Sequence, residues 1–136
     1  MKNLILILLL TPIFIMSQNK QEEKQAKIAA IKWLKKIDNG NYLESWDSAD
    51  KYFQNQIQRE RWSAALNASR LPLGKLTSKR TLSSSDYKSE LAGAPDGNYY
   101  VFTYNISYEK KNIAQETLTL IQTYQGEWKV VGFLIK

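Results

Sequence analysis

The spacing of apolar residues changes once along this 136-residue chain, near residue 75, and this change limits the fold more than any other feature of the sequence. Before residue 75, apolar residues recur every three or four positions, which is the spacing of one face of an α-helix. After it, they alternate with polar residues, as in a β-strand with one buried face. Helices followed by strands that short turns connect predict an α+β domain with an antiparallel sheet.

Three helices are predicted in the first half of the chain, over residues 20–39, 42–53 and 56–70. The first is the clearest, because five apolar residues follow one stripe along it: Ala26, Ala30, Trp33, Leu34 and Ile37. It is expected to end at Asn39-Gly40, since glycine is common directly after a helix. Pro72 ends the third helix, because proline cannot donate the next backbone hydrogen bond.

The second predicted helix carries a capping signal at its start. Asn41 is suited to accept a hydrogen bond from the first turn, and Glu44 lies three residues further on as a reciprocal capping partner. The apolar side formed by Tyr42 and Trp46 is interrupted at Ser48. We therefore expect this helix to be short or broken near Ser48.

Four strands are predicted after residue 75, over residues 75–82, 99–109, 113–124 and 128–135. The strand at 99–109 follows a strong turn signal, Pro95-Asp96-Gly97. The region between residues 83 and 97 is polar and rich in turn formers, so it predicts at most a short strand near residues 86–91. The sheet is expected to curve around the three helices, with an apolar face under them and a mixed face outside.

The first 17 residues predict a secretory signal peptide. Lys2 supplies the positive start, an apolar run covers residues 4–16, and Ser17 is small enough to precede the cleavage site. A membrane-spanning helix needs about 20 apolar residues, so an uncleaved anchor is the alternative and no stable span is expected after cleavage. No cysteine follows the run, which excludes a lipoprotein. We expect a secreted or periplasmic protein with one domain, residues 18–136.

The chain contains no cysteine and no histidine. Disulfides, thiol nucleophiles, Cys/His zinc sites and imidazole bases are therefore excluded, and neither a cofactor nor a metal is expected. Removing residues 1–17 takes away one lysine and no acid, so the net charge falls from +6 to +5. The basic residues are scattered, which argues against a nucleic-acid partner but leaves open a weak attraction to an anionic membrane surface.

Two charged residues fall on strand positions that should point inward. Arg80 shares its face with Leu82, and Glu116 shares its face with Leu118. An inward charge is costly unless it is paired, so Arg80 and Glu116 are expected to meet or to share a polar pocket. Either they form an anion-binding or acid–base site at the mouth of the fold, or they form a salt bridge that closes the sheet. Arg70 is a second candidate partner for Glu116.

Aromatic residues are the other candidate site residues. The inward face of the strand at 99–109 is almost wholly aromatic: Tyr100, Phe102, Tyr104, Ile106 and Tyr108. Together with Trp46 and Trp62, whose helices should border the mouth, Tyr100 and Tyr104 could line a ligand cavity. If these rings fill the interior instead, it has no room for a small molecule. Buried tyrosine hydroxyls also need hydrogen-bond partners.

Four motifs in order carry a family resemblance: A-x-x-W-L-x-x-I-D-x-G-x-Y-x-x-S-W (residues 30–46), W-x(7)-R-x-P-L-G (62–74), P-D-G-x-Y (95–99), and Glu116 with G-x-W-K-V-x-G-F (126–133). The chain resembles the domain-of-unknown-function 4019 family. That family is similar to the cystatin-like cone of nuclear transport factor 2-like and SnoaL-like proteins. The resemblance implies a secreted or periplasmic bacterial domain with a cone-shaped fold, and it assigns no activity.

Three functions fit the sequence. The first is a non-catalytic module of the cell envelope that binds a small amphipathic ligand or another envelope protein. The second is a small SnoaL-like isomerase or hydrolase with a carboxylate base. Asp38 and Asp47 are the candidates, but Asp38 is expected to be exposed at a helix end. The dehydratases of the superfamily typically rely on a histidine, which this chain lacks. The third is a homodimer formed through the outer face of the sheet, which carries Tyr99, Val101, Thr103, Asn105 and Ser107.

Overall fold

The computed structural model describes residues 11–136. The first ten residues of the predicted signal peptide lie outside this range. Helix α1 (Thr11–Asp38) begins within the predicted peptide and continues past the predicted cleavage site, whose use stays a prediction. None of the helices in the described part of the chain is long and apolar enough to cross a membrane.

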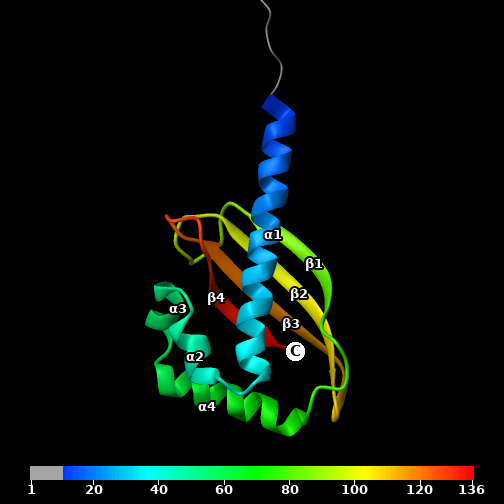
Figure 1. Cartoon of the computed structure of the whole chain (residues 1–136). Helices are drawn as coiled ribbons and strands as arrows, with labels where there is room; N and C mark the ends of the chain where they lie inside the picture. The colour runs from blue at the N-terminus through cyan, green and yellow to red at the C-terminus, as the bar shows by residue number, and fades with distance from the viewer. Residues whose placement is uncertain (1–10) are drawn as a thin grey trace, which may run out of the picture.

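Helix α1 lies across one face of a curved sheet, and the shorter helices lie at the far end of α1 beside β4 (Figure 1). The shorter helices are α2 (Tyr42–Asp47), α3 (Lys51–Gln56) and α4 (Arg59–Arg70), and a 3-10 turn follows at Leu71–Leu73. The second predicted helix is therefore two helices, α2 and α3, and the break falls where the sequence predicts it.

The end of α1 is a Schellman motif. Gly40 adopts a left-handed conformation with φ of 75° and donates its backbone N–H to the carbonyl of Ile37 at 3.1 Å. The N–H of Asn41 donates to the carbonyl of Lys36 at 2.8 Å. These two bonds satisfy carbonyls that the helix itself leaves free. They confirm the predicted stop and fix the direction in which the chain enters α2.

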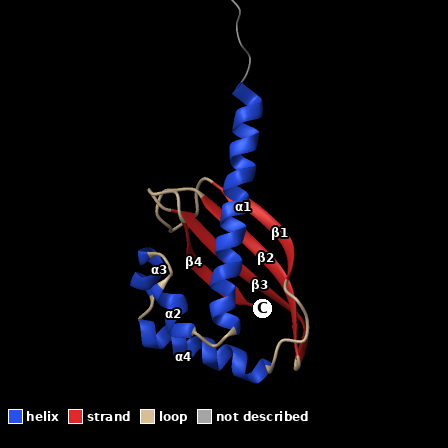
Figure 2. Cartoon of the chain, in the orientation of Figure 1, coloured by secondary structure: helices blue, strands red, loops and turns tan. Residues whose placement is uncertain are grey.

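The sheet is an antiparallel meander whose strand order follows the chain: β1 (Thr81–Lys88), β2 (Tyr99–Tyr108), β3 (Lys111–Gln122) and β4 (Trp128–Ile135). Figure 2 shows these strands as one layer, with the helices as the other. The register shifts once in each of the three strand pairs. Such irregularities bend and twist a sheet, so they account for its curvature.

The prediction for the first strand is wrong at both ends. Before Thr81, where the strand itself begins, the expected segment forms an isolated bridge between Leu76 and Tyr108 instead of a strand. The strand continues to Lys88, through a segment that was expected to be mostly turn. β1 lies at the edge of the sheet and is exposed along much of its length. Its side chains therefore need not alternate between apolar and polar, and the strand lacks the usual sequence signal.

The main core lies between α1 and the sheet. The inner stripe of α1, including Ala30 and Leu34, packs with Phe102, Leu118 and Leu120 in one buried cluster. The expectation that Tyr99 lies on an open outer face is wrong. Tyr99 is fully buried, and its hydroxyl donates to the carbonyl of Pro95 in the preceding loop.

Candidate functional site

One guanidinium binds two carboxylates inside the domain. Arg80 donates from Nε to Glu116 Oε1 at 2.5 Å and from Nη2 to Glu116 Oε2 at 3.2 Å. Its Nη1 and Nη2 donate to the two carboxylate oxygens of Asp38, each at 2.9 Å. The predicted contact between Arg80 and Glu116 is therefore present, and Asp38 is a third member that the sequence did not indicate.

The fold places these three groups from separate elements. Asp38 is the last residue of α1, Arg80 directly precedes β1, and Glu116 lies on β3 opposite Tyr104. The side chain of Glu116 is 0 % exposed. Burial alone would lower the pKa of Arg80, but its hydrogen bonds to Asp38 and Glu116 raise that pKa above the ordinary value. Arg80 therefore stays charged and holds both carboxylates.

Arg70 extends this cluster on the α4 side. Its Nη2 lies 3.3 Å from Asp38 Oδ1, and its guanidinium carbon lies 5.6 Å from the centre of the Tyr108 ring. The prediction that Arg70 partners Glu116 is wrong, because Arg70 binds Asp38 instead. Asp38 was expected to be solvent-exposed at its helix end. Its side chain is only 22 % exposed, because Arg70 from α4 and Arg80 from the segment before β1 both contact it.

The tyrosine hydroxyls near the cluster do not bind it. Arg80 donates to Glu116 and Asp38, and among the described residues no hydrogen bond joins it to Tyr104 or Tyr108. The Tyr108 hydroxyl is buried and has no hydrogen-bond partner within residues 11–136. Burial is the largest cause that raises the pKa of both tyrosines to about 12. These features are those of a packed interior, in which Arg80 and Glu116 close the sheet against α1.

The candidate tryptophans also belong to the packing. Trp62 Nε1 donates to Ser45 Oγ at 3.0 Å, and Trp33 Nε1 donates to the Ser45 carbonyl at 2.8 Å. Trp46 is half-buried, and its Nε1 donates to the carbonyl of Ile57 at 2.8 Å. All three indole N–H groups thus bind protein atoms between the helices.

The interior is filled by aromatic rings. Tyr100 stacks on Phe102 with 5.5 Å between ring centres, and Phe102 contacts Tyr104 with 6.3 Å between centres. All three residues are buried. Aromatic rings thus occupy the space between α1 and the sheet in which the sequence predicted a possible ligand cavity. A ligand-binding role for Trp46, Trp62, Tyr100, Tyr104, Arg80 and Glu116 stays a prediction.

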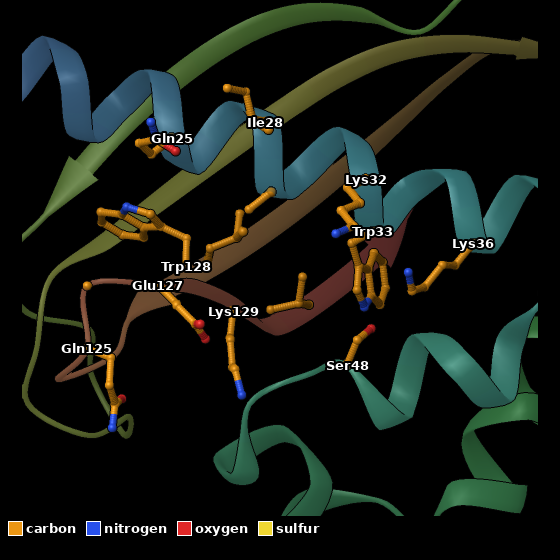
Figure 3. Close-up of a pocket in the computed structure, with 14 residues that line it drawn as sticks. Gln25, Ile28, Lys32, Trp33, Lys36, Ser48, Gln125, Glu127, Trp128 and Lys129 are labelled. Atoms are coloured by element: carbon orange, nitrogen blue, oxygen red, sulfur yellow. The ribbon is translucent and has the colours of Figure 1, made fainter.

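A cleft of about 550 Å³ opens outside this core, between α1 and β4. Its apolar lining comes from α1, β3 and β4: Ile28, Ala29, Trp33, Leu120, Trp128 and Val130. Its polar lining is mostly at the rim: Gln25, Lys32, Lys36, Ser48, Gln125, Glu127 and Lys129. Figure 3 shows Lys32 and Lys36 on either side of Trp33, with Lys129 on the facing strand.

Three of the residues that line the cleft are lysines: Lys32, Lys36 and Lys129. These three lysines form no salt bridge among the described residues, so their ammonium groups are available to a negatively charged group. In residues 11–136, no group of three or more acidic side chains is placed to hold a metal ion. Sequence reasoning missed the cleft. Lys32 and Lys36 are spaced i, i+4 beside the apolar stripe of α1, but only the packing of α1 on β4 shows that they face Lys129.

Fold and site together define an α+β domain with helices on an antiparallel meander, a buried arginine–carboxylate cluster and an open cleft beside β4. A family model described as "Protein of unknown function (DUF4019)" matches residues 29–133, and the chain belongs to this family. A comparison with curated proteins finds no match. The wider likeness to nuclear transport factor 2-like cones stays a prediction.

Proposed function

We propose that this protein is an exported, non-catalytic module of the cell envelope that holds a small amphipathic ligand in the cleft between α1 and β4. The cleft itself carries the proposal. Its volume of about 550 Å³ lies within the range of small-molecule sites, roughly 300–1,000 Å³. Export rests on the N-terminal sequence, with its Lys2 and the apolar run at residues 4–16.

The lining indicates a ligand with an apolar body and a negative end. Ile28 is 53 % exposed and Ala29 is partly exposed, so these two residues offer apolar surface that an alkyl or aromatic group would bury. Lys32, Lys36 and Lys129 outnumber the single acidic residue of the lining, Glu127. A carboxylate or phosphate at the rim would therefore gain a charge-assisted hydrogen bond to an ammonium group.

The isomerase alternative has less support from the geometry. A carboxylate base must be free to take a proton from its substrate. Asp38 and Glu116 both accept hydrogen bonds from Arg80, and Glu116 is fully buried. Neither carboxylate lines the cleft.

The binding proposal is tested with dodecanoate and, as a neutral probe of equal chain length, dodecanol. Tryptophan fluorescence of the protein is expected to change on titration with dodecanoate and much less with dodecanol, because only the carboxylate meets the lysines. Replacing Lys36 and Lys129 together by glutamate should weaken dodecanoate binding at least about tenfold, since two attractive charges become repulsive. The control variant replaces Lys110 and Lys111 by glutamate. These lysines are exposed on the β2–β3 hairpin, so the control changes the net charge by the same amount away from the cleft.

Equal weakening in the two double variants would contradict a site in the cleft. Native mass spectrometry of the protein purified from its own envelope fraction identifies a retained natural ligand. The proposal would be overturned if neither probe changed the tryptophan fluorescence and the purified protein also carried no retained ligand.

Homodimerisation through the outer face of the sheet is a second candidate function. The two central rows of that face carry no charge: Thr103, Thr117 and Leu134 in one row, and Val101, Thr119 and Gly132 in the other. Uncharged, half-exposed sheet surface suits an interface between two copies. Sedimentation velocity should show a dimer that Thr119→Lys dissociates. A monomer at every concentration tested would count against this candidate.

A further inference from the structure

The side of α1 that faces away from the sheet forms a surface of its own, which we call the outer α1 face. It consists of lysines around two isoleucines: Lys24, Lys27, Ile28, Ile31, Lys32 and Lys35. Ile28 is 53 % exposed and Ile31 is 46 % exposed. Two large apolar side chains on one helix are thus left open to solvent while lysines surround them.

Helix geometry explains why these residues share a side. Lys24, Ile28, Ile31 and Lys35 are spaced i, i+4, i+7 and i+11, which is one stripe of an α-helix at about 100° per residue. The stripe that packs on the sheet, which includes Ala30 and Leu34, lies roughly opposite. Figure 1 shows no other element over the outward side of α1. The outer α1 face is therefore a second, smaller apolar stripe on a helix whose first stripe is already buried.

The charged residues of the outer α1 face are all positive. Two acidic residues of α1 bind partners on the sheet side, since Glu23 accepts from Ser85 and Asp38 accepts from Arg80. Glu23 also pairs with Lys27 at 2.6 Å. The other lysines of the face form no salt bridge among the described residues. The face consequently presents unpaired cations beside apolar groups.

We propose that the outer α1 face lies against an anionic phospholipid bilayer, with α1 parallel to the membrane plane. A helix lying in the interface buries its apolar residues at the level of the headgroups and keeps its lysines beside the phosphates. Long lysine side chains reach the phosphates while their methylene groups follow the apolar surface. The charges and the two isoleucines of the face match this environment. The face lies entirely after the predicted cleavage site, so the mature chain keeps it.

Most of the outer α1 face lies apart from the cleft, although Ile28 and Lys32 border both surfaces. With the outer α1 face on a bilayer, the sheet would point away from the membrane. Each lysine close to an anionic surface strengthens binding by roughly fivefold, and the attraction weakens as salt screens it. Binding through this face should therefore be reversible and salt-dependent.

The chain has no cysteine, so a single introduced cysteine reports on one position. Ile28→Cys, labelled with an environment-sensitive fluorophore, is mixed with vesicles of phosphatidylglycerol and phosphatidylcholine or of phosphatidylcholine alone. Its emission should rise with the anionic vesicles and fall again at high salt. The control is Ile113→Cys with the same label, because Ile113 is 84 % exposed on β3 and far from the face. Its emission should not change.

A charge test on the unlabelled protein completes the experiment. Lys24→Glu combined with Lys35→Glu should weaken co-sedimentation with anionic vesicles at least about tenfold. Lys110→Glu combined with Lys111→Glu alters the net charge equally and should weaken it much less. An equal response at positions 28 and 113, an equal loss in the two double variants, or no binding to anionic vesicles would overturn the proposal. Binding of an acidic protein without any vesicle response would assign the face to a protein partner instead.

Discussion

Arg80 is the residue on which the buried cluster depends. Its guanidinium is bound to both Asp38 and Glu116, and no other cation among the described residues pairs with Glu116. Removing it leaves a fully buried carboxylate without a partner. The loss in free energy of unfolding is then set by the unpaired buried charge of Glu116. This loss is larger than the net stabilisation that the ion pair itself provides.

Arg80→Ala should therefore lower the free energy of unfolding by about 3–5 kcal/mol, measured by urea denaturation. Arg59→Ala is the control, because Arg59 pairs with Asp47 at 2.7 Å on the exposed surface and should lower it far less. Similar losses in both variants would contradict a structural role for the buried cluster. Dodecanoate binding by folded Arg80→Ala should stay close to that of the parent protein, since Arg80 does not line the cleft.

Tyr108 shows the cost of a polar group that finds no partner. Its hydroxyl is buried and unpaired, whereas the Tyr99 hydroxyl donates to the Pro95 carbonyl. Tyr108→Phe should raise the free energy of unfolding by about 1 kcal/mol, because it removes an unsatisfied hydroxyl and keeps the ring beside Arg70. Tyr99→Phe should lower it by about 1 kcal/mol. Loss of stability in Tyr108→Phe would show that its hydroxyl has a partner, such as a buried water.

The same tyrosines predict a loss of stability at alkaline pH. The pKa of Tyr104 and that of Tyr108 are both raised to about 12 in the folded protein, while an unfolded tyrosine titrates near pH 10. The folded state therefore holds protons that the unfolded state has lost between these values. The contribution of these two tyrosines to the free energy of unfolding is fully present below about pH 10 and declines as the pH rises towards 12. Urea midpoints measured across this range should fall, and Tyr108→Phe should reduce the slope.

At the level of the element, the end of α1 decides how helices and sheet meet. The Schellman motif at Gly40 turns the chain into α2, and Asp38 enters the cluster one residue before the helix cap. Gly40 has φ of 75°, and a Cβ added there would meet no atom within 4 Å. A substitution at Gly40 therefore tests the backbone conformation alone.

Gly40→Ala should lower the free energy of unfolding by about 1–2 kcal/mol, because an L-residue is strained in the left-handed region. Gly132→Ala on β4 is the matched control. Gly132 does not have a positive φ, and an added Cβ would make an ordinary contact with Thr119 at 3.8 Å. That variant should be neutral or slightly more stable, since alanine restricts the unfolded chain. Thermal unfolding that ranks the two variants in the opposite order would refute this account of the α1 terminus.

Elements with a strong apolar period could be predicted, and elements without one could not. β4 has the predicted bounds, and α2 and α3 separate at the predicted break. The bounds of β1 were predicted wrongly because its side chains are mostly exposed. The capping prediction for Asn41 is also wrong. Asn41 occupies the N-cap of α2 without a side-chain hydrogen bond, whereas Asp50 caps α3 by accepting from the N–H of Tyr52 at 2.9 Å.

The candidate site follows the same rule. The prediction that Arg80 and Glu116 meet or share a polar pocket rested on strand alternation. The two residues do meet, although Arg80 directly precedes β1 and is not part of a strand. Alternation could not predict Asp38, because it says nothing of where a helix end meets the sheet. The cleft was missed for a similar reason. It depends on the gap between α1 and β4, which is set by tertiary packing and has no local pattern.

Across the whole molecule, α1 has three faces with separate tasks. One side fills the core, a second borders the cleft through Lys32 and Lys36, and a third forms the outer α1 face. The two proposed interactions use adjoining sides of the same helix, which share Ile28 and Lys32. A protein lying on a bilayer would thus keep its cleft beside the membrane surface, where amphipathic molecules with a negative end are concentrated.

The contact of α1 with β4 also has a consequence for the order of events during synthesis. Trp128 and Val130 on β4 share one buried cluster with the inner stripe of α1, and α3 contacts the same strand. A nascent chain that has not yet grown past residue 135 lacks this side of the core. Its helices could not yet be buried in a complete hydrophobic core, because β4 is synthesised last. Such a chain would stay incompletely folded until translation of β4 is complete.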